Sequence, residues 1–330
     1  CGVCHSDLSA TTGKIPYPPP LVLGHEAAGV VVEVGEGVTA FKEGDHVVST
    51  FISMCGKCSQ CVRGRPVLCE NARKAMFNLP DGTVRTKGAD GEPLNVFGAC
   101  GVMAEFATMH VDNCVKVDET VPMQNAALVG CAVMTGVGAV FNTAKLEPGS
   151  RAAVFGIGGV GLNAIQGCVT AGAEMIVAVD SNPAKLAMAK EFGATHTVNI
   201  NEVEDAAKAV KKMTGGVDYA FECVGAGPVV EQAYKSLGRG GTAVVVGVAD
   251  PKDKTSLTTL TLPADERTLK GSWLGSARPQ HDFPRILGLY KAGKLKLDEL
   301  VTRTYTIEEA AQAFDDMVAG KNARGVIVFE

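Results

Sequence analysis

Charged and aromatic residues are both scarce in this chain of 330 residues. Charged side chains make up 20% and aromatic side chains 5%, and 31 Lys and Arg against 36 Asp and Glu leave a formal net charge of −5. Without an excess of positive charge the chain lacks the attraction that a phosphate backbone requires, so we expect no nucleic-acid partner. A hydrophobic content of 46% excludes a disordered chain and indicates a globular protein.

Long hydrophobic runs are missing as well. Runs such as Met175–Val179 fall far short of the ~20 residues that a membrane helix needs, so we expect no membrane partner. The first five residues, CGVCH, include no initial Met and do not resemble a signal peptide. We therefore expect that residues precede Cys1 in the whole protein.

Cysteine and glycine are abundant by contrast, with 11 Cys and 39 Gly. An odd, clustered set of cysteines is a poor disulfide framework, whereas many glycines indicate tight turns and close backbone approaches. At roughly 100 to 200 residues per domain, the length predicts two domains.

The two parts of the chain differ in their hydrophobic patterns. Between residues 21 and 50, β-branched runs at Gly29–Gly35 and Asp45–Val48 are separated by glycine turns, which predicts antiparallel strands and a mainly β first part. From Ser150 onward, strands and helices alternate, which predicts an α/β fold with a doubly wound parallel sheet. The predicted strands are Arg151–Phe155, Met175–Asp180, Val217–Glu222 and Thr242–Val248, with Gly325–Phe329 near the end, and the predicted helices are Val160–Ala171, Pro183–Phe192, Glu231–Leu237, Phe283–Ala292 and Ile307–Ala319.

A glycine-rich motif lies between the first predicted strand of this part and the following helix. It contains Gly156, Gly158, Gly159 and Gly161, and Asp180 ends the next predicted strand. Glycines in this context form a tight turn, admit a pyrophosphate and let helix and strand pack closely. A carboxylate at Asp180 would bind an adenosine ribose and repel a 2′-phosphate, which favours NAD over NADP.

Four cysteines, Cys55, Cys58, Cys61 and Cys69, have the spacing of a closed tetrahedral zinc site. Such a site stabilises a loop and has no open position for chemistry; an iron–sulfur cluster is the alternative. A second set, Cys4, His25 with Glu26, and Cys131, is scattered along the sequence. Taken singly, these residues are typical of a protein core, and their spacing does not indicate that they form one site.

These motifs together resemble the zinc-dependent medium-chain alcohol dehydrogenases over essentially the whole chain. The similarity includes Gly2–Asp7, Gly24–Glu26, the four-cysteine lobe, Gly130–Cys131 with Thr135–Gly136, the glycine-rich motif with Asp180, and Ala323–Arg324. The resemblance implies a discontinuous GroES-like catalytic domain, lacking its first strands, at residues 1–132 and 275–330, and a Rossmann NAD-binding domain at residues 133–274. It also implies two zinc ions per chain. The segment Ala75–Val96 resembles the longer, dimeric members of the family, which favours a homodimer.

The resemblance further implies that Cys4, His25 and Cys131 bind a catalytic zinc with one open position for the substrate oxygen. Asp7 would orient His25, Glu26 would assist ligand exchange, and Ser6 would take the alcohol proton. The implied cofactor contacts are His5, Thr135, Val160, Lys185, Val246 and Arg324 in addition to the glycine-rich motif and Asp180. The implied substrate contacts are Phe51, Phe97, Val248 and Trp273.

Two departures from family patterns bear on activity. Ser9 stands where many relatives have the histidine that completes a proton relay, so the relay must end in a water or run less efficiently. Arg73 matches a glutathione-binding arginine of formaldehyde dehydrogenases, but the loop Gly13–Tyr17 lacks the acidic pair of those enzymes.

We therefore expect an oxidoreductase that reversibly oxidises primary or aromatic alcohols to aldehydes, passing hydride to NAD through a zinc alkoxide. The alternatives are a thiol-dependent formaldehyde dehydrogenase and a non-catalytic sensor that binds NAD or zinc. Because at least six of the 11 cysteines are assigned to metal as thiolates and the rest show no pairing pattern, we expect a cytoplasmic location.

Overall fold

The structure is a computed structural model that describes residues 1–72 and 77–329. Its contacts divide the chain into two compact units, Cys1–Ala132 with Ala277–Glu330 (unit 1) and Val133–Ser276 (unit 2). The sequence had placed the second boundary after residue 274. Arg73 lies outside the described residues, and so does part of the segment Ala75–Val96.

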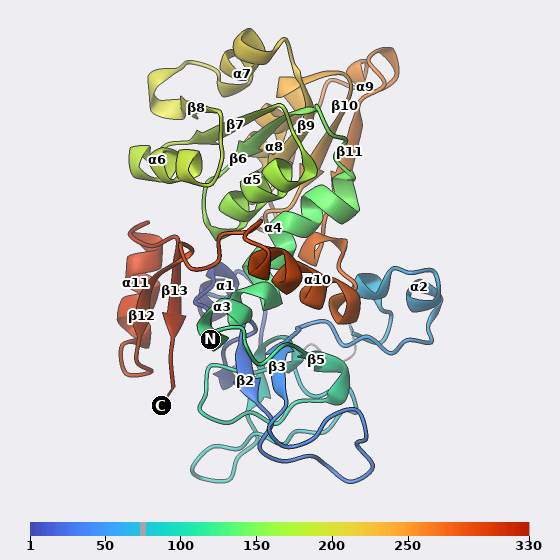
Figure 1. The fold of residues 1–330 in the computed structure, drawn as a ribbon, viewed down its shortest axis with the longest axis vertical. Helices are drawn as coiled ribbons and strands as arrows, with labels where there is room; N and C mark the ends of the chain where they lie inside the picture. The colour runs from blue at the N-terminus through green and yellow to red at the C-terminus, as the bar shows by residue number, and fades with distance from the viewer. Residues whose placement is uncertain (73–76, 330) are drawn as a thin grey trace. The chain divides into compact units, whose positions relative to one another are not determined.

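Unit 2 is built on a six-stranded sheet whose strands all pair in parallel (Figure 1). The strand order is β11-β10-β9-β6-β7-β8, so the chain reverses its direction of winding at β6. The strands are β6 (Arg151–Phe155), β7 (Met175–Asp180), β8 (His196–Asn199), β9 (Val217–Glu222), β10 (Leu237–Val245) and β11 (Thr268–Gly271). This topology confirms the predicted doubly wound fold, in which ligands bind at the reversal point.

The helices of unit 2 begin and end at residues with strong local preferences. They are α4 (Met134–Gly138), α5 (Gly159–Ala171), α6 (Pro183–Glu191), α7 (Ala206–Thr214), α8 (Gly227–Ser236) and α9 (Thr261–Ala264). The side chains of Asn182 and Asp205 accept hydrogen bonds from the first turns of α6 and α7, and Gly172 and Gly215 end α5 and α7 in the left-handed conformation.

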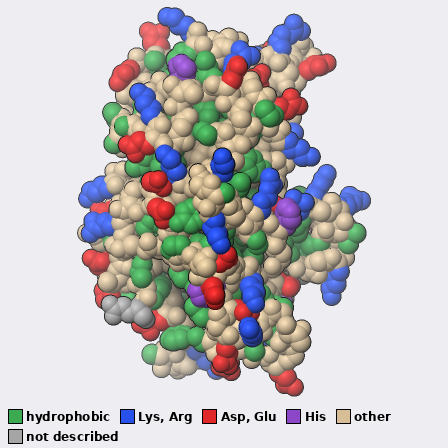
Figure 2. All heavy atoms as spheres, viewed as in Figure 1, with side chains coloured by type: hydrophobic (Ala, Val, Ile, Leu, Met, Phe, Trp, Pro, Cys, Tyr) green, Lys and Arg blue, Asp and Glu red, His purple; other side chains and the backbone are tan. Residues whose placement is uncertain are grey.

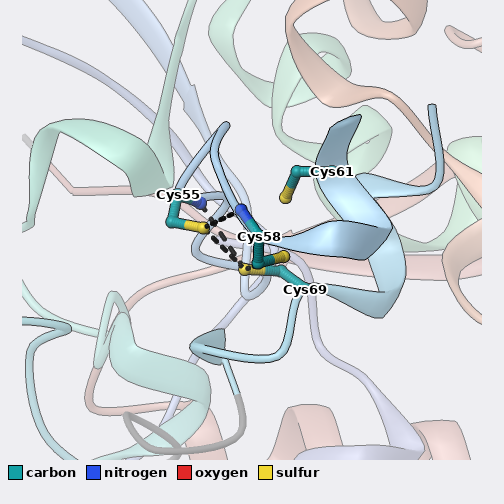
Figure 3. A group of neighbouring side chains, drawn as sticks. All are labelled: Cys55, Cys58, Cys61 and Cys69. Carbon is teal, nitrogen blue, oxygen red and sulfur yellow. Dashed lines mark hydrogen bonds between the residues drawn. The ribbon is translucent and has the colours of Figure 1, made fainter. Parts of the chain in front are cut away.

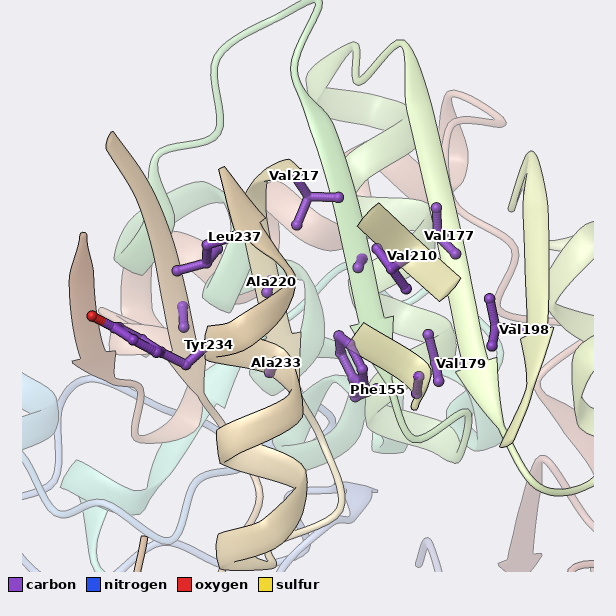
Figure 4. Packing of buried hydrophobic residues seen from close by; sticks show 13 residues of the cluster. Phe155, Val177, Val179, Val198, Val210, Val217, Ala220, Ala233, Tyr234 and Leu237 are labelled. Carbon is purple, nitrogen blue, oxygen red and sulfur yellow. The ribbon is translucent and has the colours of Figure 1, made fainter. Parts of the chain in front are cut away.

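Both faces of this sheet are covered. Ala153 and Phe155 of β6 pack in a buried cluster with Val210 of α7 and Ala233 of α8 (Figure 4). Side chains alternate along a strand, so Val154, which is fully buried, lies on the opposite face, next to Gly161 of α5. Burial on both faces explains why the strand sequences are hydrophobic without alternation.

Unit 1 contains several small sheets. A three-stranded antiparallel sheet has the order β2-β3-β5, β1 pairs with β4, and β12 pairs with β13. The strands are β1 (Leu21–Val22), β2 (Ala28–Val30), β3 (His46–Ser49), β4 (Asn95–Val96), β5 (Cys114–Lys116), β12 (Val301–Tyr305) and β13 (Arg324–Ile327). The helices are α1 (His5–Thr11), α2 (Ser59–Val62), α3 (Met123–Leu128), α10 (Pro279–Lys291) and α11 (Ala310–Val318). The first part therefore contains the expected antiparallel strands, which are short and joined by long loops.

The sequence did not predict a continuous helical stretch that spans Met123–Ala144. It contains two π-helical segments, Val129–Val133 and Ala139–Ala144. By its length and mean hydropathy this helix could span a membrane. However, 78% of its most hydrophobic window is buried inside the protein. This burial is typical of a core helix in a globular protein.

Candidate active site

The four-cysteine lobe brings its sulfur atoms together. The loop that carries them includes the short helix α2, and all four sulfurs lie within 4.8 Å of one another (Figure 3). The Sγ atom of Cys69 lies 3.6 Å from that of Cys55 and 3.9 Å from that of Cys58. Four thiolates at 2.3 Å from one tetrahedral zinc lie about 3.8 Å apart, so these distances fit a single ion.

Backbone groups already stabilise thiolate charge in this lobe. The Cys58 N–H donates to Cys55 Sγ at 3.3 Å, and N–H groups of Lys57 and Cys58 lower the pKa of Cys55 to about 6. Cys61 differs, because burial raises its pKa to about 12. A bound cation would favour the thiolate form of all four.

A second group of possible ligands, Cys4, His25, Glu26 and Cys131, forms in unit 1 from three distant segments. Their ligand atoms also lie within 4.8 Å of one another, and all four residues are buried. Cys4 precedes α1, His25 follows the left-handed Gly24, and Cys131 lies in the π-helical segment Val129–Val133. Local π-helical turns are frequent at functional sites, and this one belongs to the helix that the sequence did not predict.

Glycine at position 24 allows the close approach that sets His25 in place. Its φ is +94°, and a Cβ there would lie 2.2 Å from the backbone nitrogen of Met103. A larger residue would displace the loop that carries His25.

Asp7 orients His25 by contacting the Nδ1 side of its ring. Its Oδ1 lies 3.3 Å from His25 Nδ1 and accepts a hydrogen bond from the Gly24 N–H at 2.8 Å, and the Asp7 side chain is fully buried. Burial opposes a charge on His25, but Asp7 and Cys4 together raise its pKa well above the ordinary value. A carboxylate on one ring nitrogen leaves the other nitrogen as the ligand atom.

The two thiols of this group share charge. A hydrogen bond from Cys131 lowers the pKa of Cys4 and, together with burial, raises that of Cys131. Two sulfurs and an imidazole form the donor set of a catalytic zinc with one open position. The residues present therefore fit the metal.

Glu26 is held by a cation from the other end of the chain. The Arg324 guanidinium donates to it from Nη2 to Oε2 at 2.5 Å and from Nε to Oε1 at 3.3 Å. Burial raises the pKa of Glu26 to about 7, although Arg324 opposes the rise. The predicted contact of Arg324 with a cofactor pyrophosphate stays a prediction; in the structure its partner is Glu26.

The glycine-rich motif forms the predicted strand–turn–helix. Gly156 has a φ of +91°, and a Cβ on Gly161 would lie 1.9 Å from the Gly156 carbonyl oxygen. Nothing lies within 4 Å of the corresponding position on Gly158, which precedes the first turn of α5. The turn therefore exposes backbone beside the N-terminus of a 13-residue helix, where a phosphate group binds favourably.

Comparisons with known proteins agree with this geometry. The model of the alcohol dehydrogenase GroES-like domain matches residues 1–119, and that of the zinc-binding dehydrogenase matches residues 159–292. The chain belongs to the zinc-dependent medium-chain alcohol dehydrogenases. It is an oxidoreductase that uses zinc and NAD(P), as the family does.

Three relatives illustrate the range of the similarity. The chain is 45% identical to the putative alcohol dehydrogenase D of Mycobacterium tuberculosis and 38% identical to the S-(hydroxymethyl)glutathione dehydrogenase of Paracoccus denitrificans. Each alignment covers 99% of this chain and 90% of the relative. The crystal structure of benzyl alcohol dehydrogenase from Acinetobacter calcoaceticus superimposes with a TM-score of 0.91 at 33% identity, covering 99% of this chain and 90% of that one.

Other residues expected to act in this alcohol dehydrogenase are distributed over both units. In unit 1, His5 and Ser6 lie in the first turn of α1, His5 exposed and Ser6 half-buried, and the rings of Phe51 and Phe97 contact His25. In unit 2, Val246 is buried, Thr135, Val160 and Lys185 are half-buried, and Val248 and Trp273 are exposed. Their roles toward cofactor and substrate stay predictions.

Asp180 has a structural role that the sequence did not indicate. Its Oδ2 accepts a hydrogen bond from the Ile157 N–H at 2.7 Å, and its Oδ1 accepts one from the Asn182 N–H at 2.9 Å. The carboxylate thus holds the glycine-rich turn as well as standing at the end of β7.

The sequence analysis missed two residues near these sites. Glu222, buried at the end of β9, accepts hydrogen bonds from the Val224 and Gly225 N–H groups at 2.8 and 2.6 Å, much as Asp180 holds its own turn. An acidic residue at a strand end followed by glycine was the available signal. Tyr17, whose ring packs on Phe97, had no signal in the sequence.

Proposed function

We propose that this enzyme reversibly oxidises primary or aromatic alcohols to aldehydes, with NAD as the hydride acceptor and two zinc ions per chain. The observation that carries the proposal is the convergence of Cys4, His25 and Cys131 with Asp7 behind the imidazole. Cys4, His25 and Cys131 would hold a zinc ion, which would supply the polarisation of an alcohol or carbonyl oxygen. The four-cysteine lobe would hold the second ion, which has no open position.

The chain's own residues would position the reactants and move the proton. Asp7 fixes the His25 ring, and the phenyl rings of Phe51 and Phe97 pack against it. Ser6, two residues after Cys4, would accept the hydroxyl proton of the alcohol. Ser9, on the same helix, stands in place of the relay histidine, so the proton would leave through a water or be transferred less efficiently.

The cofactor preference rests on Asp180. Its carboxylate stands at the end of β7, where a ribose hydroxyl would bind, and its negative charge would repel a 2′-phosphate. In this proposal His5 and Arg324 would lie toward the pyrophosphate, Lys185 toward the adenosine ribose, and Thr135, Val160 and Val246 toward the nicotinamide. The proposed substrate contacts are Phe51 and Phe97 in unit 1 and Val248 and Trp273 in unit 2.

A homodimer is part of the same proposal. β11 is an edge strand of the sheet in unit 2, its residues Leu269–Gly271 are exposed, and Leu269 is 39% exposed. An uncovered edge with exposed apolar residues is suited to pairing with a second copy.

A cytoplasmic location fits the six thiols that must stay reduced.

The 38% identity to an S-(hydroxymethyl)glutathione dehydrogenase keeps a thiol-dependent formaldehyde dehydrogenase as the second candidate. One experiment decides between the two. The full-length, metal-replete protein is assayed with NAD and NADP on benzyl alcohol, straight-chain primary alcohols, and formaldehyde with and without glutathione, and its zinc content is measured. If formaldehyde with glutathione is the only substrate turned over, the second proposal replaces the first. If no substrate is turned over, both proposals are overturned.

A further inference from the structure

Four aromatic rings contact His25 or one another in unit 1. The whole sequence contains 12 Phe, 5 Tyr and 1 Trp. Phe51 stands at 5.4 Å from the His25 ring, centroid to centroid, and Phe97 at 5.0 Å. Tyr17 lies 4.5 Å from Phe97, and Phe77 lies 5.0 Å from Tyr17 in an edge-on arrangement.

Hydrogen bonds from backbone and side-chain groups connect the three segments that carry the outer rings. β1, just after Tyr17, pairs with β4, just before Phe97. Asn95 Nδ2 donates to the Pro18 carbonyl at 2.8 Å, and the Val96 N–H donates to the Phe77 carbonyl at 2.8 Å. The rings therefore stand on a fixed framework, which limits how far each can move.

The row of rings leads outward from the candidate metal site. His25 is 2% exposed and Phe97 is 5% exposed, whereas Tyr17 and Phe77 are half-buried. Figure 2 shows Lys and Arg side chains interspersed with Asp and Glu side chains on the face that it draws.

The Tyr17 ring packs on Phe97, and Tyr17 is half-buried. Burial raises the pKa of Tyr17 to about 12, although the backbone of Gly98 opposes the rise. Gly98 itself has a φ of +59°, and a Cβ there would lie 2.8 Å from Phe51 Cβ. Tyr17 thus packs on the ring of Phe97, which in turn contacts His25.

We propose that Tyr17 is a specificity-determining residue, which favours alcohols with a planar aromatic ring by holding the Phe97 ring beside His25 and extending the row with its own. The inference rests on the proposed alcohol dehydrogenase function. In a benzylic alcohol one CH₂ group separates the hydroxyl from the ring, so a hydroxyl at the metal site brings that ring to the side chains that contact His25. Aromatic pairs at these centroid distances gain energy beyond the area that they bury, whereas a saturated ring of equal size gains only the area.

The test compares benzyl alcohol with cyclohexylmethanol, which differ in ring planarity rather than in the position of the hydroxyl. We expect Tyr17→Leu to lower the kcat/KM ratio of benzyl alcohol to cyclohexylmethanol by roughly two- to tenfold, mainly through KM. Tyr17→Phe keeps the ring and should keep most of the ratio. Phe106→Leu, at a phenylalanine of the same unit that is 75% exposed, is the matched control and should leave the ratio unchanged.

Equilibrium binding of the two alcohols to the zinc-loaded enzyme gives a second readout, in which Tyr17→Leu should weaken benzyl alcohol alone. If Tyr17→Leu does not fold, Phe77→Leu removes the ring that packs edge-on against Tyr17 and should shift the ratio in the same direction. An unchanged ratio in the folded variant, with both alcohols still oxidised, overturns the inference and leaves the proposed function intact. Failure of the unmodified enzyme to oxidise any alcohol overturns the proposed function instead.

Discussion

The Arg324 guanidinium and the Glu26 carboxylate form a buried ion pair between residues 298 positions apart, with Nη2 2.5 Å from Oε2. Arg324 is 6% exposed and Glu26 is fully buried. The pair joins β13, near the C-terminus, to the segment that carries His25. A cation from the end of the chain thereby compensates a carboxylate beside the candidate metal ligands.

Removing one partner of this pair should be costly. Arg324→Met leaves Glu26 buried without a cation, so we expect a loss of about 3–5 kcal/mol in the free energy of unfolding. Combined with Glu26→Gln, the same substitution should cost less, since no uncompensated charge remains. Urea unfolding of the zinc-loaded variants measures both.

Lys291→Met is the matched control, because it breaks a surface pair with Asp118 in which both side chains are about half exposed. Its cost should not exceed about 1 kcal/mol. Equal losses for Arg324→Met in the presence and absence of Glu26→Gln would show that the two residues are not coupled.

Metal removal should expose the four-cysteine lobe to thiol reagents. In the zinc-loaded protein we expect Cys55, Cys58, Cys61 and Cys69 to resist iodoacetamide at pH 7.5. After chelation Cys55 should react first, because backbone N–H groups lower its pKa to about 6. Mass spectrometry of the labelled peptides measures the order.

Cys100 is the internal control for that experiment. It is 1% exposed, and burial raises its pKa, so it should react slowly with or without metal. Labelling of Cys55 at the same rate before and after chelation would exclude a metal in the lobe, and iron in the elemental analysis would favour the iron–sulfur alternative.

The sequence predicted unit 2 more closely than unit 1 because unit 2 is built from local signals. Continuous hydrophobic runs predicted strands β6, β7 and β9 with their observed bounds, and Gly156–Gly161 was recognised from its spacing together with the strand before it, the helix after it and Asp180. The helix α8 begins at Gly227 rather than at the predicted Glu231, with Pro228 in its first turn.

The catalytic group in unit 1 depends on contacts between distant segments. Cys4, His25 and Cys131 share no spacing rule, so only the family resemblance joined them, and the fold then placed them together. The helix around Cys131 was missed because its glycines and β-branched residues have low helix propensity, and burial stabilises it nevertheless. The contacts of Tyr17 with Phe97 and of Arg324 with Glu26 have no local signature at all.

Two glycines of the nucleotide turn should differ in their response to alanine. Gly161→Ala places a methyl group against the Gly156 carbonyl, at 1.9 Å, so we expect the variant to lose several kcal/mol of stability or fail to fold. Gly158→Ala meets no atom within 4 Å, so its thermal unfolding should be unchanged. If a pyrophosphate lies against this backbone, Gly158→Ala should still weaken NAD binding by tenfold or more in an equilibrium titration. Unchanged affinity would place the pyrophosphate elsewhere.

The charge of Asp180 should control the choice between NAD and NADP. Asp180→Asn keeps an oxygen that can accept the Ile157 N–H but removes the charge that repels a 2′-phosphate. We expect the kcat/KM ratio of NADP to NAD to rise at least tenfold, with a small loss of thermal stability because the amide has no second oxygen to accept the Asn182 N–H. Asp205→Asn, which retains a cap on α7 in the same unit, is the matched charge control and should leave the ratio unaltered.

Asp316 should make the stability of unit 1 depend on acidity. Its buried carboxylate accepts hydrogen bonds from Arg303, Tyr305, Gln312 and Lys321, and chiefly Lys321 holds its pKa below the ordinary value. The unfolded chain therefore takes up a proton before the folded one does as the pH falls. The stabilisation is complete at neutral pH and is lost progressively below about pH 4. Asp316→Asn cannot ionise, so its urea midpoint should lie furthest below that of the unmodified protein at pH 7, and the difference should shrink toward pH 3.

Asp315→Asn, at the exposed neighbouring position, controls for the loss of one negative charge and should show no such trend. A difference for Asp316→Asn that stays constant from pH 7 to pH 3 would mean that the carboxylate acts by its shape and hydrogen bonds rather than by its charge.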